Sequence, residues 1–181
     1  MPQLNQSYFE LRQTYEIATA FSRHGVEFLF LGKGGAIILG YPGATQDVDL
    51  FPKKSRENAE GIIQALRDLK FPVTEEIARD ILNGKDFVQI KNGPYELDLI
   101  FAPDGIESFE IAKSRQHLID GLPVANIRDI IASKKAAGRE KDIVDLPLLE
   151  DFRQEFEKSL RGEPKTAVEI ALERLKTSDP D

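Results

Sequence analysis

Several residue types that build common functional sites are scarce or missing in this sequence. Its 181 residues include no cysteine, which excludes disulfide frameworks, thiolate metal sites and cysteine nucleophiles. The only two histidines, His24 and His117, make a histidine-built zinc site improbable, and we predict structural roles for both. No apolar run approaches the roughly 18 residues of a membrane span, and the first residues lack the pattern of a signal peptide. We therefore expect a cytoplasmic protein with no membrane partner.

The charge balance limits the kind of partner. The net charge of -7 argues against a protein that coats nucleic acid by bulk charge, although a local basic site for a nucleotide or an RNA end remains compatible with it. Hydrophobic residues make up 41% of the chain, enough for a sizeable core in one domain.

Hydrophobic periodicity and turn residues predict an α+β fold, with a small mixed sheet flanked by helices and a helical C-terminal third. We expect an α/β core over 1–125 and, packed on the same domain, a helical segment over 126–181. Asn92-Gly93 predicts a hairpin, and Pro147 predicts a break or kink. The expected strands are 26–32, 47–52, 86–91 and 95–101, and the expected helices are 7–23, 33–40, 56–69, 74–83, 126–137, 140–160 and 164–176.

Two carboxylates share one face of an otherwise apolar predicted strand. Side chains alternate along a strand, so Asp47 and Asp49 point the same way and repel each other. A divalent cation between them removes that repulsion, and Mg²⁺ favours carboxylates together with substrate phosphates. A lone Asp-x-Asp is, however, commonly a solvated pair on an edge strand. Asp98, inside a second apolar strand, favours a metal site if the two strands pair.

A glycine pair precedes the first of these strands. Gly34-Gly35 follows a buried apolar run and opens a short helix, an arrangement that lets backbone N–H groups approach an anion. The stretch LGKGGAIILGYPGATQDVDLF, with ELDLIF farther along, resembles the signature of the nucleotidyltransferase superfamily with the DNA polymerase β-like fold. IASKKAAGREKDIVDLPLL is similar to a helical segment of minimal nucleotidyltransferases that include toxins of type IV toxin–antitoxin systems.

The resemblance assigns roles to particular residues. It implies that Asp47, Asp49 and Asp98 bind Mg²⁺ or Mn²⁺ and carry catalysis, with Asp98 acting as or holding the general base. Gly34 and Gly35 are then expected to bind the nucleoside triphosphate. Relatives often carry Arg-x-Thr before the Asp-x-Asp, and this chain has Ala44 at the arginine position. Lys33 is a candidate replacement, and Thr45 is a further candidate nucleotide-binding residue.

Two cations on the predicted C-terminal helices complete the candidate site. Lys134 continues the apolar stripe of Ile127 and Ile131, where a lysine must reach water or an anion, and the resemblance also places a lysine there. We therefore expect it to contact the triphosphate. Arg139 either pairs with Asp142 on the surface or reaches phosphate.

Three functions agree with these residues. The first is a metal-dependent nucleotidyltransferase that moves a nucleoside monophosphate group to an acceptor, which could be RNA, a protein or a small molecule. The second is an inactive nucleotide-binding or interaction protein that keeps the fold, which Ala44 favours. The third is the toxin-like member of a toxin–antitoxin pair, with an antitoxin-like partner.

Overall fold

The computed structural model describes residues 9–162. The helix predicted at 164–176 lies outside the described residues, as do the first residues of the helix predicted at 7–23. Among the described helices, none combines the length and the apolar character needed to cross a membrane.

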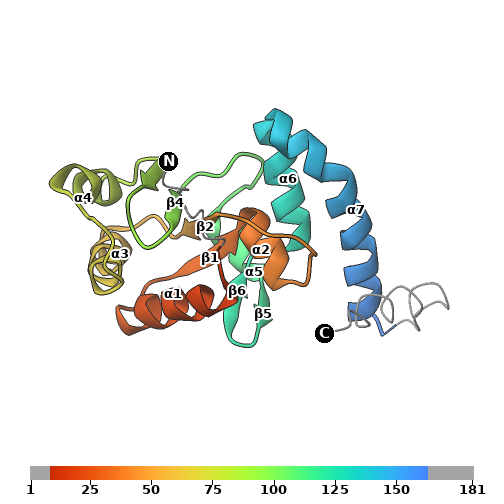
Figure 1. Cartoon of the computed structure of the whole chain (residues 1–181), viewed down its shortest axis with the longest axis horizontal. Helices are drawn as coiled ribbons and strands as arrows, with labels where there is room; N and C mark the ends of the chain where they lie inside the picture. Colours follow the sequence, from red (N-terminus) through yellow and green to blue (C-terminus); the bar gives the residue numbers. More distant parts are fainter. Residues whose placement is uncertain (1–8, 163–181) are drawn as a thin grey trace, which may run out of the picture.

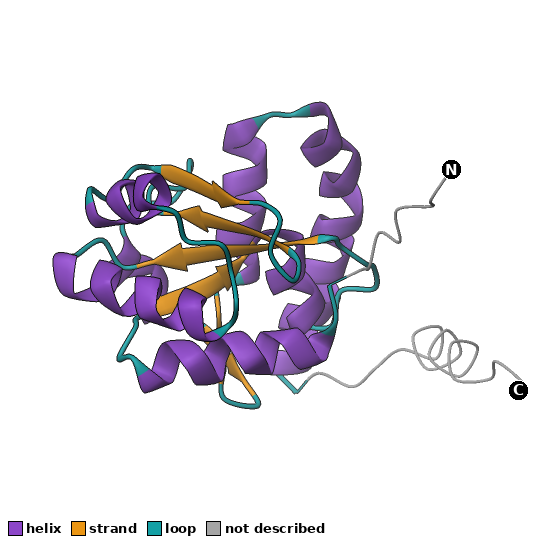
Figure 2. Cartoon of the chain, turned by 60° about the vertical axis from the view of Figure 1, so that its left-hand side comes forward, coloured by secondary structure: helices purple, strands orange, loops and turns teal. Residues whose placement is uncertain are grey.

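One mixed sheet organises the described part of the chain, with strand order β3-β4-β2-β1-β6-β5. The pairs β2/β4 and β1/β6 are parallel, and the other three pairs are antiparallel. Figure 2 shows the strands stacked side by side with helices around them. The strands are β1 (Phe28–Leu31), β2 (Asp47–Pro52), β3 (Phe87–Ile90), β4 (Glu96–Ile100), β5 (His117–Ile119) and β6 (Leu122–Val124).

The helices form two groups around this sheet (Figure 1): α1, α3 and α4 lie at one end, and α6 and α7 run side by side at the other. α2 lies between β1 and β2 in sequence and packs on β2 and α6. The helices are α1 (Leu11–Arg23), α2 (Gly32–Ile38), α3 (Arg56–Asp68), α4 (Glu75–Leu82), α5 (Phe109–Ser114), α6 (Ile127–Ala137) and α7 (Glu140–Leu160). The division into 1–125 and 126–181 stays a prediction.

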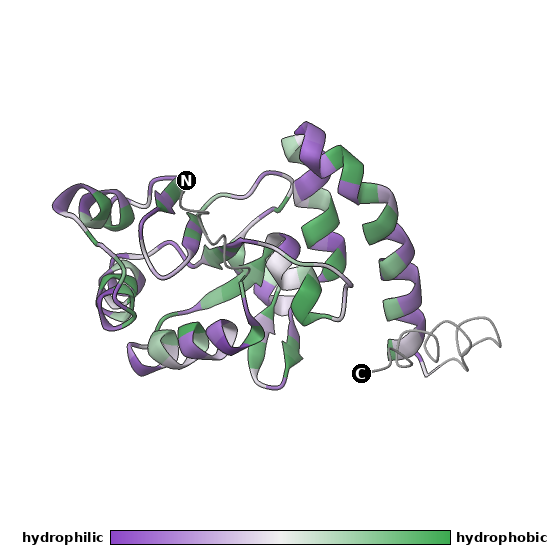
Figure 3. Ribbon diagram, in the orientation of Figure 1, coloured by the Kyte–Doolittle hydropathy of each residue, from purple (hydrophilic) through white to green (hydrophobic). Residues whose placement is uncertain are grey.

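The core forms on the sheet because β1 is apolar on both faces and because β2 and β4 are apolar on the face opposite their carboxylates. Every residue of β1 is buried, and Leu50, Leu97 and Leu99 are fully buried on β2 and β4. Figure 3 shows the corresponding concentration of hydrophobic residues on the strands, with alternating hydrophobic and hydrophilic bands on the helices. A carboxylate buried in this sheet, as Asp98 is, costs free energy unless it is paired.

Several predicted elements are confirmed. β2 spans 47–52 as predicted, and Ser55 caps α3 by accepting a hydrogen bond from the Asn58 N–H. α6 begins after Asn126 and ends at Gly138, whose φ of 61° suits glycine. The hairpin between β3 and β4 is also present, and residues 91–95 connect its strands.

The predicted break at Pro147 was wrong, because α7 continues through it. Proline removes one intrahelical hydrogen bond, to the carbonyl of Ile143. Both residues are exposed, so water can bind that carbonyl, and the neighbouring turns keep the helix continuous.

Residues 109–124 hold three elements that the sequence interpretation left out: α5, β5 and β6. β5 and β6 form a hairpin whose turn, Asp120-Gly121, has φ values of 48° and 82°. Asp-Gly is a strong signal for such a turn and could have identified the hairpin. The strands have three residues each and Leu118 is exposed, so the hydrophobic pattern was too short to register.

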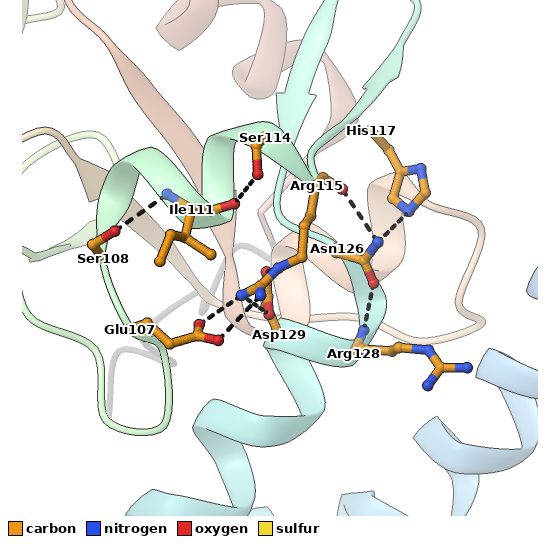
Figure 4. A network of polar contacts seen from close by, with 9 residues as sticks. All are labelled: Glu107, Ser108, Ile111, Ser114, Arg115, His117, Asn126, Arg128 and Asp129. Atoms are coloured by element: carbon orange, nitrogen blue, oxygen red, sulfur yellow. Dashed lines mark hydrogen bonds and ion pairs between the residues drawn. The ribbon is translucent and has the colours of Figure 1, made fainter.

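An ion-pair network around the buried Asp129 carboxylate links α6 to the end of α5 (Figure 4). The Arg115 guanidinium donates to both oxygens of Asp129, at 3.1 and 2.7 Å, and also binds Glu107. The Asn126 side chain accepts a hydrogen bond from the Arg128 N–H at the start of α6. The network anchors the first turn of the helix that carries Lys134.

Candidate active site

Three carboxylates meet where β2 and β4 lie side by side. The strands are parallel, and Asp49 stands opposite Asp98 in their register. Since Asp47 precedes Asp49 by two residues, its side chain falls on the same face. One carboxylate oxygen from each of Asp47, Asp49 and Asp98 lies within 4.8 Å of the others. The structure therefore brings together the three acidic residues that the sequence singled out.

The three carboxylates have too little positive charge near them to offset their own negative charge. Burial, followed by the charges of Asp98 and Asp47, raises the pKa of Asp49 to about 7. Burial is also the main cause that raises the pKa of Asp98 to about 6, against a hydrogen bond from Gln89. Asp98 Oδ1 is buried and has no hydrogen-bond partner. Buried carboxylate oxygens normally have a donor or a cation, so this atom points to a ligand.

The loop before β2 holds the triad in place. Thr45 Oγ1 donates to Asp47 Oδ1 at 3.0 Å and contacts its backbone oxygen at 3.2 Å. The Phe9 N–H donates to the Thr45 carbonyl at 2.7 Å, while the Phe9 ring packs edge-on against Tyr95, just before β4. Phe9 thus ties together the starts of the two strands that carry the carboxylates.

Close packing explains why glycines stand at the start of α2, and triphosphate binding by Gly34 and Gly35 stays a prediction. Gly34 and Gly35 are buried inside α2, and a Cβ on Gly35 would lie 3.0 Å from the Phe30 carbonyl oxygen, so close packing requires this glycine. The sequence interpretation missed Gly32. Its φ is +62°, and a Cβ there would lie 1.9 Å from Asp49 Oδ2. Gly32 therefore makes the space that the Asp49 carboxylate occupies, a role that no periodicity signals.

A cavity of about 520 Å³ opens in front of Asp47 and Asp49. Ala44 and Thr45 line it on the loop side. Four cations from α2, α6, α7 and the turn before α7 also line it: Lys33, Lys134, Arg139 and Lys141. An acidic protein thus places carboxylates and a cluster of positive charge on the walls of one cavity. A polyanion that also carries a divalent cation would be complementary to such walls.

Buried acids hold two of these cations. Asp142 was expected on the helix surface, but it is fully buried and accepts from Arg139 Nε at 2.7 Å and Lys134 Nζ at 3.4 Å. Burial alone would raise the pKa of Asp142, yet these hydrogen bonds and charges lower it below its usual range. Lys134 also lies 3.9 Å from Asp145, which is equally close to Lys33.

The sequence interpretation missed Asp142 and Lys141 as cavity residues. Asp142 follows Arg139 by three positions, which also fits an ordinary surface pair. Only the packing of α7 on α6 reveals its burial. The two histidines have partners elsewhere: His24 Nε2 lies 2.7 Å from Asp68 Oδ2, and His117 packs on the Phe156 ring.

One comparison with known proteins gives a match, and it concerns the fold. No family model matches the sequence, and no curated protein matches it. Among solved structures, the chain is similar to the lincosamide antibiotic adenylyltransferase LnuA in its lincomycin-bound crystal structure, with a TM-score of 0.57. The match has 16% sequence identity and covers 80% of this chain and 98% of the other. The chain has a nucleotidyltransferase fold. At this identity the likeness is evidence for architecture, and function must be argued from the site.

Proposed function

We propose that this protein is a nucleotidyltransferase that moves a nucleoside monophosphate group from a nucleoside triphosphate to an acceptor hydroxyl, with release of pyrophosphate. The observation that carries the proposal is the triad of Asp47, Asp49 and Asp98, with an unpartnered buried oxygen on Asp98, beside a cavity walled by cations. The fold shared with an adenylyltransferase supports it.

The donor set of the triad fits a divalent cation. Three carboxylate oxygens within 4.8 Å of one another are hard ligands, and their mutual repulsion is what a cation would relieve. We propose that Asp47, Asp49 and Asp98 hold Mg²⁺ or Mn²⁺. When bound, such an ion polarises phosphoryl oxygens and offsets charge that develops on them.

The protein's own groups divide the remaining work. Lys33, Lys134 and Arg139 line the cavity and would bind the triphosphate, while Gly34 and Gly35 shape the start of α2 next to it. Thr45 orients Asp47 through its hydroxyl. Positioned cations lower the cost of gathering negative charge at the transferred phosphorus.

The reaction is an in-line displacement. The acceptor oxygen forms a bond to the α-phosphorus as the bond from that phosphorus to the bridging oxygen breaks, and pyrophosphate leaves. Asp98, whose buried Oδ1 has no hydrogen-bond partner, takes the acceptor's proton. The toxin-like form of this proposal, aimed at RNA or a protein and controlled by an antitoxin-like partner, rests on the sequence resemblance alone.

Label transfer tests the proposal. The purified protein is incubated with each α-³²P-labelled nucleoside triphosphate, Mg²⁺ or Mn²⁺, and a cell extract. Wild-type protein should label an acceptor, and the Asp47→Asn, Asp49→Asn variant should not. Asp104→Asn, which changes an exposed acid on a loop away from the cavity lining, serves as the matched control and should retain activity. Nucleotide binding with no transfer in any extract would instead identify a nonenzymatic nucleotide-binding protein.

A further inference from the structure

The first half of α7 carries an exposed apolar strip beside the cavity. The strip consists of Ile143, Val144, Pro147 and Leu148, which form two adjacent i,i+4 rows on one side of the helix. Ile143, Val144 and Leu148 are 57, 74 and 60% exposed. Only nine large hydrophobic side chains in the described part of the chain are exposed, so three within six residues form a cluster.

Core packing does not explain this strip. α7 meets the rest of the protein through its other side, where Asp142 and Leu149 are buried and Leu146, Phe152 and Phe156 pack on the core. The side of α7 that packs on the core is therefore not the side that carries the strip. An exposed apolar cluster that the fold does not use is a candidate binding surface.

The strip is continuous with the candidate active site, because Val144 belongs to both. Its side chain lines the cavity that contains Asp47 and Asp49. Ile143 and Leu148, which do not line the cavity, extend the apolar surface of α7 beyond Val144.

Size and charge select the occupant. A stable protein interface takes about 20–30 residues from each partner, far more than this strip provides, which argues against a second copy of the chain. Acids flank the strip: Glu140 precedes Val144 by four positions, and Asp151 follows Pro147 by four; both are exposed. Both acids lie beside the strip, so they disfavour a polyanionic acceptor there.

We propose that the strip binds the apolar part of a small hydroxyl-bearing acceptor, whose hydroxyl receives the nucleoside monophosphate group in the cavity. The inference rests on the proposed function and adds the acceptor's class to it. The acceptor carries no net negative charge and holds an apolar group within a few bonds of the reacting hydroxyl. Transfer leaves a phosphodiester on the acceptor oxygen, and the hydroxyl proton goes to Asp98.

A homologous series of probes tests the strip. Transfer of labelled AMP from ATP is measured with methyl, butyl and hexyl β-glucosides, for wild-type protein and for Ile143→Ser, Leu148→Ser. Leu160→Ser is the matched control, since Leu160 lies on the same helix, is 59% exposed and is remote in sequence from the strip. In wild type and control, kcat/KM should rise about two- to fourfold for each added CH₂ group. In the strip variant the rise should fall below about 1.5-fold.

Binding measurements separate failure of this inference from failure of the proposed function. Methyl NMR of Ile143 and Leu148 reports hexyl glucoside binding even if no transfer occurs, and calorimetry reports ATP binding. One outcome is that ATP binds and hexyl glucoside perturbs the strip, but no transfer follows. The inference that the strip binds an apolar group then holds, and the enzyme proposal fails. Three results would overturn the inference. They are an equal rise in kcat/KM per CH₂ group in the strip variant, no change in the Ile143 and Leu148 methyl signals, and ATP binding weakened more than threefold by the variant. Preferential labelling of RNA would also overturn it.

Discussion

The carboxylates on α7 and those on the sheet differ in their partners. Asp142 on α7 is fully buried, but Arg139 and Lys134 donate to it and its pKa is lowered. On the sheet, burial is the main cause that raises the pKa values of Asp49 and Asp98, and neighbouring carboxylates add to it. The first group therefore stabilises the folded chain, whereas the second costs stability until a ligand binds. This contrast separates an acid that the protein's own cations neutralise from acids that we propose to bind a divalent cation, although the residue type is the same.

Removing the triad should have the largest effect on activity and an opposite effect on stability. The Asp47→Asn, Asp49→Asn variant should lose about 10³-fold or more of its transfer rate, since both proposed metal ligands are gone. Without divalent ions it should unfold at a higher urea concentration than wild type at pH 8. A variant that loses activity and stability together would place the triad with the structural acids.

A methyl group at Gly32 should disturb the triad without removing a carboxylate. Gly32→Ala places a Cβ where Asp49 Oδ2 lies, and displacement of about 1 Å can lower transfer about 100-fold. Gly25→Ala is the matched control, because its φ of +66° imposes the same backbone strain but nothing lies within 4 Å of the new Cβ. Both variants should lose about 1 kcal/mol of stability, and only the first should lose activity. Equal activities would show that Asp49 tolerates displacement.

Removing the buried acid on α7 should destabilise the protein. Asp142→Asn leaves Arg139 and Lys134 without their carboxylate, and the free energy of unfolding should fall by about 2 kcal/mol in urea titrations. The matched change Asp49→Asn should leave stability at pH 8 unchanged or raise it. The comparison fails if both substitutions shift the unfolding midpoint in the same direction.

The pH dependence of stability should distinguish the groups by sign. Because the pKa of Asp49 rises from 3.8 to about 7 on folding, the folded chain binds more protons between these values. Stability without divalent ions should therefore decrease from about pH 4 to about pH 7, on the order of 2 kcal/mol. Thermal unfolding in EDTA checks this. Mn²⁺ at pH 8 should restore the loss in wild type and have little effect on Asp49→Asn.

The sequence predicted the parts of the site that depend on regular alternation. Asp47 and Asp49 were assigned to one face of a strand at 47–52, and Asp98 to a second apolar strand, as observed. Alternation in an apolar strand leaves little freedom for where such side chains point. Alternation within each strand could not show that β2 and β4 pair in a register that sets Asp49 opposite Asp98.

Features that depend on packing between distant segments were missed. Asp142 looked like one member of an exposed ion pair, since its burial arises only when α7 packs beside α6. Gly32 drew no attention because its partner, Asp49, lies seventeen positions later in the sequence and on another element. The strands of the β5/β6 hairpin were too short for periodicity to reveal, although Asp120-Gly121 signalled their turn.

The pairing of β2 with β4 has a consequence for how the protein can be studied. Residues 53–95, which include α3, α4 and β3, connect β2 to β4, the strand that pairs with β2 in parallel. An unfolded chain holds only Asp47 and Asp49 near each other, so high-affinity Mn²⁺ binding requires this long loop to close. The ion would therefore serve as a spectroscopic reporter of folding, and of reassembly when the chain is cut near Gly84 and the two fragments are mixed.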